Sequence, residues 1–191
     1  MGVSVPRIPY VSHSEAGPPD LVEAIRARRG GGLLNLDRML LMSPALARGW
    51  NAHLGAVRTG FTLAARLREL AICAVAVLNG ADYELGQHLP LYRGAGGGER
   101  AVEVLRTYRA ARGGTVPFNE ADGFDAAEQA ILQLTLEMTQ NIRVSDATFE
   151  RVRSELKDDQ QTVELVAVVA TYNMVSRFLV ALGVDAEAET R

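Results

Sequence analysis

Residues 62–92 read TLAARLRELAICAVAVLNGADYELGQHLPLY, and this stretch predicts two helices joined by a tight turn. Apolar residues recur three and four positions apart from Leu63 to Val77, which is the spacing of one buried helical face. Thr62 is expected to cap this first helix with its hydroxyl group. Gly80 supplies the stop, since glycine readily adopts the left-handed conformation that ends many helices. Asp82 is expected to cap the second helix, so the stretch predicts a helical hairpin.

Similar signals continue on both sides of this hairpin. Ser43 followed by Pro44, Asp125 followed by Glu128, and the single residue Ser145 are typical helix starts. Further helices are predicted at residues 19–30, 33–41, 44–57, 99–112, 125–141 and 159–183, with one more after residue 145. The helix predicted at residues 159–183 has an apolar side that consists of Val163, Val166, Ala167, Ala170, Met174, Phe178 and Leu182.

No window shows the apolar and polar alternation of a strand, so the predicted fold class is all-α. Residues 1–19 have the Pro, Ser and Gly content of an extended N-terminal arm. Residues 20–191 are expected to form a single helical domain, because a chain of this length can bury one good core. Residues 113–123 are the longest connection between predicted helices and are expected to form a mobile loop.

The composition excludes several classes of protein. With 48% hydrophobic and 23% charged residues, the chain is typical of a globular protein and not of a disordered one. A net charge of −3 with both signs interspersed argues against a nucleic-acid partner. The single cysteine, Cys73, favours a reducing cytoplasm. No export signal is expected. No membrane span is expected either, because no window reaches about 18 uninterrupted apolar residues.

The hairpin brings together side chains that can transfer protons. Glu84 and His88 are four residues apart, so on a helix they lie on one face and within reach of each other. Glu69 lies on the preceding helix, and the hairpin can fold it back toward them. A carboxylate beside an imidazole raises the imidazole pKa, and a second carboxylate in the same pocket raises one carboxyl pKa. Enzymes use such coupled groups as proton donors near neutral pH, although a surface Glu/His pair at this spacing also arises by chance.

This hairpin resembles the core of the carboxymuconolactone decarboxylase family, which includes the alkylhydroperoxidases of the AhpD type. The residues that carry the resemblance are Arg66-Leu67-Arg68-Glu69-Leu70-Ala71-Ile72, then Asn79-Gly80, and then Tyr83-Glu84 and His88. The likeness extends from about Leu33 to Gly183. It implies an AhpD-like helical bundle that self-associates, as a trimer or a hexamer that can be built from dimers.

In the thiol-dependent branch of this family the motif is a glutamate followed by Cys-x-x-Cys-x-x-x-His. On this chain the glutamate corresponds to Glu69, the two cysteines to Ala81 and Glu84, and the histidine to His88. A peroxidase needs one thiolate to attack the peroxide and a second thiol to resolve the sulfenate, and alanine and glutamate can do neither. The resemblance therefore implies decarboxylase-like chemistry, with Glu69, Glu84 and His88 as the catalytic residues.

Five further residues are candidates for substrate binding. Arg66 and Arg68 can hold a substrate carboxylate in two hydrogen bonds, or they can pair with a carboxylate of the protein or with solvent. Tyr83 and Trp50 can form an aromatic pocket wall, or they can simply pack in the core. Asn173 lies in the apolar last helix, where it can face the pocket or bond to a helix carbonyl.

The predicted function is proton transfer to a small carboxylated cyclic or lactone-like substrate, with loss of carbon dioxide. His88 with Glu84 would deliver the proton, Glu69 would orient or recharge that acid, and Arg66 or Arg68 would stabilise the enolate. No organic cofactor is expected if the substrate delocalises its own negative charge. A metal site is not expected, because the Glu84 and His88 spacing differs from the Glu-x-x-His of di-iron bundles.

Two alternatives remain at this stage. A hydroperoxidase or peroxiredoxin-type antioxidant would require an exposed, acidic Cys73, whereas free cysteines are more often buried and inert. A non-catalytic oligomer that binds small ligands would use the Glu/His cluster only as a buried polar network.

Overall fold

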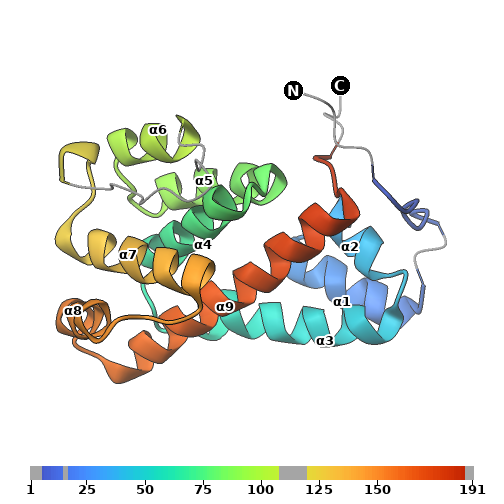
Figure 1. The fold of residues 1–191 in the computed structure, drawn as a ribbon. Helices are drawn as coiled ribbons and strands as arrows, with labels where there is room; N and C mark the ends of the chain where they lie inside the picture. Colours follow the sequence, from blue (N-terminus) through green and yellow to red (C-terminus); the bar gives the residue numbers. More distant parts are fainter. Residues whose placement is uncertain (1–5, 15–16, 108–119, 188–191) are drawn as a thin grey trace. The chain divides into compact units, whose positions relative to one another are not determined.

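The structure is a computed structural model, and it describes residues 6–14, 17–107 and 120–187. Within these residues it contains helices and no strand, as the sequence predicts (Figure 1). The α-helices are α1 (Pro19–Arg29), α2 (Asn35–Leu40), α3 (Pro44–Gly55), α4 (Ala65–Asn79), α5 (Asp82–Gly94), α6 (Glu99–Thr107), α7 (Ala126–Asn141), α8 (Asp146–Leu156) and α9 (Asp159–Leu182). A π-helical turn, η1 (Ala56–Gly60), follows α3, and a short 3-10 helix, η2 (Glu120–Asp122), precedes α7. Residues 113–119 of the predicted mobile loop lie outside the described residues.

The chain forms two compact units, residues 1–60 with 179–191 and residues 61–178. In the first unit α1 and α2 both pack against α3. The buried carboxylate of Asp37 holds this unit together, because it accepts hydrogen bonds from Arg29 Nε at 3.0 Å and from the backbone N–H of Leu34 at 3.0 Å. The described part of the N-terminal arm contacts its own unit, since the Tyr10 hydroxyl donates to Asp185 and Val11 O accepts from Arg38 Nε.

The second unit is built around α4, which contacts both α5 and α7 (Figure 1). Every residue of α4 from Glu69 to Val77 is buried. Gly80 ends the helix in the left-handed conformation with φ 65°, as predicted. The core on this side of the unit comprises Leu70, Cys73, Ala74, Val77, Leu89, Tyr92, Ala101, Val102, Leu105, Phe124 and Leu132.

Some of the predicted helix caps are confirmed. Asp125 Oδ1 accepts from the N–H of Glu128 at 2.8 Å, and Glu128 Oε2 accepts from the N–H of Asp125 at 3.0 Å, which is the predicted capping box. Ser145 Oγ accepts from the N–H of Thr148 at 3.3 Å at the start of α8. Both helices therefore begin where the sequence places them.

Two other caps were predicted wrongly. Ala64 occupies the N-cap of α4, and Thr62 instead gives its N–H and hydroxyl to Glu164 Oε2 at 2.8 and 3.1 Å. Asp82 is the first residue within α5 and follows the N-cap residue Ala81. Neither helix has a side-chain hydrogen bond at its N-cap.

The apolar side predicted for α9 is not the side that packs inward. Val163 is 68% exposed and Met174 43% exposed. The inward side includes the polar residues Glu164, Thr171 and Ser176, which are buried because they have polar partners inside the protein. By length and hydropathy α9 also resembles a membrane span, but half of its most apolar window is buried inside the protein, as in the core helix of many folds that cross no membrane.

Candidate active site

The α4–α5 hairpin joins Glu69 and His88, as the sequence predicts. The Nδ1 atom of His88 lies 2.6 Å from Oε2 of Glu69, and the side chains of both residues are almost fully buried. A carboxylate on Nδ1 fixes the orientation of the imidazole ring and stabilises positive charge on it. The pair therefore has the arrangement of an oriented acid or base, with Nε2 as the atom that can exchange a proton with a substrate.

Tyr172 of α9 fixes the histidine from another side. Its ring meets that of His88 edge to face, with 5.1 Å between the ring centroids and 85° between the planes. Tyr172 is 2% exposed, so the contact belongs to the interior of the second unit. Sequence reasoning did not single out Tyr172 as a site residue, because the only signal for it was a tyrosine in a long apolar helix.

Glu84 is buried on the same helix as His88 but is not its hydrogen-bond partner. Its side chain lies one turn before His88, and the residue is 2% exposed. Neither carboxyl oxygen makes a hydrogen bond to any residue that the structure describes. The predicted Glu84 and His88 pair is therefore not formed, and Glu69 takes the position on the imidazole.

Burial raises the pKa of the Glu84 carboxyl well above its usual value, and the nearby Ser176 hydroxyl works weakly against this. That hydroxyl is already used elsewhere, since it donates to the Tyr172 carbonyl at 2.5 Å and accepts from Asn79 Nδ2 at 3.0 Å. Neither Glu84 oxygen forms a hydrogen bond with it, and burial without a partner favours the uncharged form of the Glu84 carboxyl.

Asn173 is committed to the protein frame. Its side chain accepts from Asn79 Nδ2 at 3.1 Å and donates to Thr139 Oγ1 and to the Val169 carbonyl, each at 3.0 Å. Arg177 NH1 also donates to Asn173 Oδ1 at 2.6 Å. Of the two roles considered from the sequence, the structure therefore shows the bond to a helix carbonyl.

The two candidate arginines have different partners. Arg66 NH1 lies 2.6 Å from Glu128 Oε1 and its NH2 lies 2.8 Å from Asp125 Oδ2, so both ends of the guanidinium are in ion pairs on α7. The Tyr92 hydroxyl donates to the same Glu128 oxygen at 2.7 Å. Arg68 instead directs Nε toward Glu69 Oε1 at 3.4 Å, and its side chain is 14% exposed. Arg68 is thus the arginine beside the Glu69 and His88 pair.

The last two substrate-binding candidates, Trp50 and Tyr83, lie on different helices. Trp50 is buried on α3, in the first unit, and Tyr83 is half-buried in the first turn of α5.

Cys73 is fully buried, and burial together with the carboxyls of Glu69 and Glu84 raises the pKa of its thiol far above the usual range. Within the described parts of the chain, no group of three His, Cys, Asp or Glu side chains is arranged to hold a metal ion.

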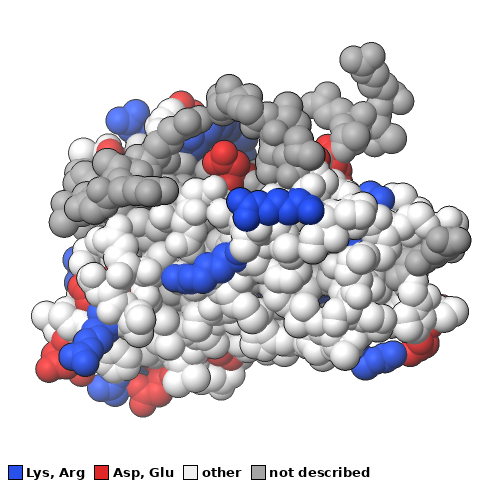
Figure 2. All heavy atoms as spheres, turned by 45° about the vertical axis from the view of Figure 1, so that its right-hand side comes forward, with Lys and Arg blue, Asp and Glu red and all other residues white. Residues whose placement is uncertain are grey.

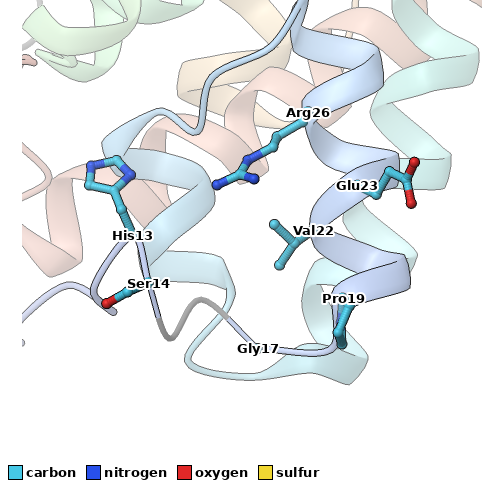
Figure 3. Close-up of a pocket in the computed structure, with 7 residues that line it drawn as sticks. All are labelled: His13, Ser14, Gly17, Pro19, Val22, Glu23 and Arg26. Carbon is cyan, nitrogen blue, oxygen red and sulfur yellow. The ribbon is translucent and has the colours of Figure 1, made fainter.

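A separate hollow of about 480 Å³ lies in the first unit, between the arm and α1 (Figure 3). Val22 and Arg26 point into it, whereas Glu23 turns away on the other side of α1 (Figure 3). None of the residues predicted from the sequence to bind substrate or to act in catalysis lines this hollow.

Residues 44–137 match the Carboxymuconolactone decarboxylase family, and this segment includes the whole α4–α5 hairpin. The chain belongs to the carboxymuconolactone decarboxylase family. No curated protein matches it significantly. The matched segment therefore contains the hairpin in which Glu69 and His88 meet.

Solved structures show the same fold over nearly the whole chain. An uncharacterized peroxidase-related protein from Silicibacter sp. TM1040 is 20% identical with a TM-score of 0.73, over 98% of this chain and 97% of its own. An alkylhydroperoxidase AhpD core protein from Ralstonia eutropha JMP134 is 19% identical with a TM-score of 0.76, over 97% and 94%. The debrominase Bmp8 in complex with 2,3,4-tribromopyrrole is 15% identical with a TM-score of 0.74, over 98% and 95%. The fold is therefore an AhpD-like helical bundle.

Proposed function

We propose that this family member is a lyase that transfers a proton to carbon in a small carboxylated cyclic or lactone substrate as carbon dioxide leaves. The observation that carries the proposal is the buried hydrogen bond of 2.6 Å between Glu69 Oε2 and His88 Nδ1, at a motif position that contains no sulfur. A carboxylate that orients an imidazole is the usual arrangement of a general acid and base.

Besides the substrate, the proposed reaction needs only His88, Glu69 and solvent. The bond between the ring carbon and the substrate carboxylate breaks, and its electron pair moves into a conjugated carbonyl group to form an enolate. The imidazolium of His88 then gives its Nε2 proton to the carbon, and carbon dioxide leaves. Solvent returns one proton to His88, while Glu69 holds the ring and compensates the positive charge on it.

Arg68 is the residue proposed to hold the substrate carboxylate. Its Nε is directed at Glu69, and no described residue forms an ion pair with the other edge of its guanidinium, whereas Arg66 uses both ends on Glu128 and Asp125. An arginine with its outer edge available can bind a carboxylate in two hydrogen bonds. This position would place the leaving carboxylate next to the histidine that supplies the proton.

The complex of the debrominase with 2,3,4-tribromopyrrole supports a small ring compound as the ligand class. The family name supports a carboxylated one. The hydroperoxidase alternative lacks a nucleophile, since Cys73 is the only cysteine in the chain and is buried with a raised thiol pKa. A non-catalytic protein would release no carbon dioxide from a bound substrate, so a measurement of turnover distinguishes it from a lyase.

Carbon dioxide release should be measured with lactones that have a carboxylate on the carbon next to the ring carbonyl, and with their vinylogous counterparts. We expect turnover by the natural chain and loss of turnover in His88→Ala, because the proton donor is removed. His13→Ala is the matched control, since His13 is exposed on the arm. Turnover that His88→Ala leaves unchanged would reject the assignment, and absence of release with every compound would favour the non-catalytic alternative.

We also propose that the protein self-associates through the outward side of α9. Val163, Ala170 and Met174 on this side are exposed and apolar. On the face of the molecule drawn in Figure 2, uncharged residues cover most of the described surface. Such faces are typical of subunit contacts. Light scattering should show an oligomer for the natural chain, and Val163→Glu with Met174→Glu should dissociate it; an unchanged mass would exclude this surface.

A further inference from the structure

Glu84 is the one acidic side chain in the site that the proposed proton transfer leaves without a task. It is 2% exposed, and neither of its oxygens has a hydrogen-bond partner among the described residues. A buried polar group without a partner costs folding free energy. A ligand that supplies the missing partner would account for a carboxyl group in this place.

The position of Glu84 relative to His88 defines where such a ligand group would lie. The two residues are four apart on α5 and both are buried, so they share one face of the helix. One helical turn separates them by about 6 Å along the axis. Glu69 meets His88 through a hydrogen bond of 2.6 Å, so a group bound near Glu84 on this face would lie beside the proton donor.

Whether the Glu84 carboxyl is charged determines which kind of ligand group it can bind. The hydroxyl of Ser176 donates to the Tyr172 carbonyl and accepts from Asn79, and neither Glu84 oxygen forms a hydrogen bond with it. An uncharged carboxyl group has one O–H donor and one strong acceptor. Its natural partner is therefore an uncharged carbonyl oxygen, and a second substrate carboxylate would bring an unpaired negative charge into the interior.

We propose that Glu84 is a neutral hydrogen-bond donor to a carbonyl oxygen of the substrate, one helical turn along α5 from the histidine that protonates the carbon. This inference rests on the proposed function and narrows its substrate class to lactones or cyclic ketones that have one carboxylate and one uncharged carbonyl group. During the reaction the electron pair released by decarboxylation moves onto that carbonyl oxygen. The Glu84 O–H bond then stabilises the enolate, as protonated carboxyl groups in apolar sites can.

Two binding probes separate the carbonyl from a second carboxylate. Paraconate is a lactone with one carboxylate, and it has no conjugation that would allow decarboxylation. Hydroxymethylsuccinate is its ring-opened form and has two carboxylates. We expect calorimetric titration to show that paraconate binds at least about tenfold more tightly, a difference typical of one well-placed polar contact.

Variants of Glu84 test whether this residue causes the selectivity. Glu84→Gln retains an uncharged donor and should keep the preference for paraconate. Glu84→Met retains the length but no donor and should reduce the preference to less than about threefold. Glu155→Met, on the exposed side of α8, is the matched control and should behave like the natural chain. Equal binding of the two probes, or a preference that survives Glu84→Met, would overturn the inference while leaving the proposed function standing.

Infrared spectroscopy gives a readout that does not depend on the folding of Glu84→Met. The natural chain should show the C=O stretch of a protonated carboxyl group that Glu84→Gln lacks, and paraconate should shift this band. A band that paraconate leaves in place while it binds would mean that the carboxyl touches only internal water. Failure of both probes to bind would count against the proposed substrate class itself, and the inference would be rejected with it.

Discussion

The Nδ1 atom of His88 lies 2.6 Å from Oε2 of Glu69, so the two helices of the α4–α5 hairpin are joined inside the protein by an imidazole and a carboxylate. With Nδ1 on the carboxylate, Nε2 is the ring nitrogen that the proposed reaction uses, and Glu84, on the same face of α5, makes no hydrogen bond to a described residue.

Replacing Glu69 by Gln should reduce the maximal rate of carbon dioxide release by about 10²- to 10⁴-fold, the usual contribution of general acid and base catalysis. The amide cannot stabilise an imidazolium, although it can occupy the same space. The Michaelis constant should change little, since Glu69 does not hold the substrate in this scheme. Nitrogen NMR of His88 should show a changed proton distribution between its two ring nitrogens. A full rate with an altered NMR signal would mean that the pair serves only the fold.

The two neighbouring arginines should separate stability from binding. Arg66→Met should lower the free energy of unfolding by about 1–3 kcal/mol, because the buried carboxylate of Glu128 loses its cation. Arg68→Met should instead raise the Michaelis constant at least about tenfold with little change in unfolding. Chemical denaturation and steady-state kinetics of both variants check this. The reverse pattern would assign the substrate carboxylate to Arg66.

Local patterns in the sequence predicted those parts of the fold that depend on local contacts. The capping box of Asp125 and Glu128 joins residues three apart, and Gly80 ends α4 by its own conformation. Thr62 failed as a cap because its partner, Glu164, lies on α9, about a hundred residues later in the chain. No rule based on spacing along the chain can identify such a partner.

Spacing along the chain was an incomplete guide to the candidate site as well. The four-residue spacing correctly placed Glu84 and His88 on one face of α5, but it also suggested that they pair. The actual partner of His88 is Glu69, which reaches it across the hairpin. On α9 apolar residues occur on more than one side, and the structure buries a different set from the predicted one: Leu165, Val168, Val169, Tyr172, Val175 and Leu179. Spacing along a helix that is apolar on several sides does not show which side the rest of the chain covers.

Cys73 should resist thiol reagents in the folded protein. Its side chain is fully buried, and burial together with Glu69 and Glu84 keeps the thiol protonated, so the reactive thiolate is scarce. Titration with a chromogenic disulfide reagent should show no fast reaction under native conditions and one equivalent after unfolding in guanidinium. A fast native reaction would reopen the hydroperoxidase alternative, and Cys73→Ala would then show whether that thiol is needed for peroxide turnover.

The stability of the protein should depend on pH through Glu84 in a direction opposite to that of an ordinary ion-paired carboxylate. Burial raises the pKa of Glu84 in the folded state above the usual value of 4.5. Below 4.5 the residue is protonated in both states and contributes nothing to the pH dependence. Above 4.5 the unfolded chain releases this proton while the folded chain keeps it, so folding becomes less favourable as pH rises toward the raised pKa.

The free energy of unfolding of Glu84→Gln, measured by denaturant titration across this range, should therefore exceed that of the natural chain by an amount that grows with pH. The slope for one group is about 1.4 kcal/mol per pH unit. Asp125 and Glu164 change the free energy of unfolding with pH in the opposite direction, because hydrogen bonds to their carboxylates outweigh burial and lower their pKa values. Both proteins share these two groups, so their contribution cancels in the difference. A difference that stays constant above pH 4.5 would show that Glu84 is already ionised in the folded protein, and a neutral donor at this position would then be excluded.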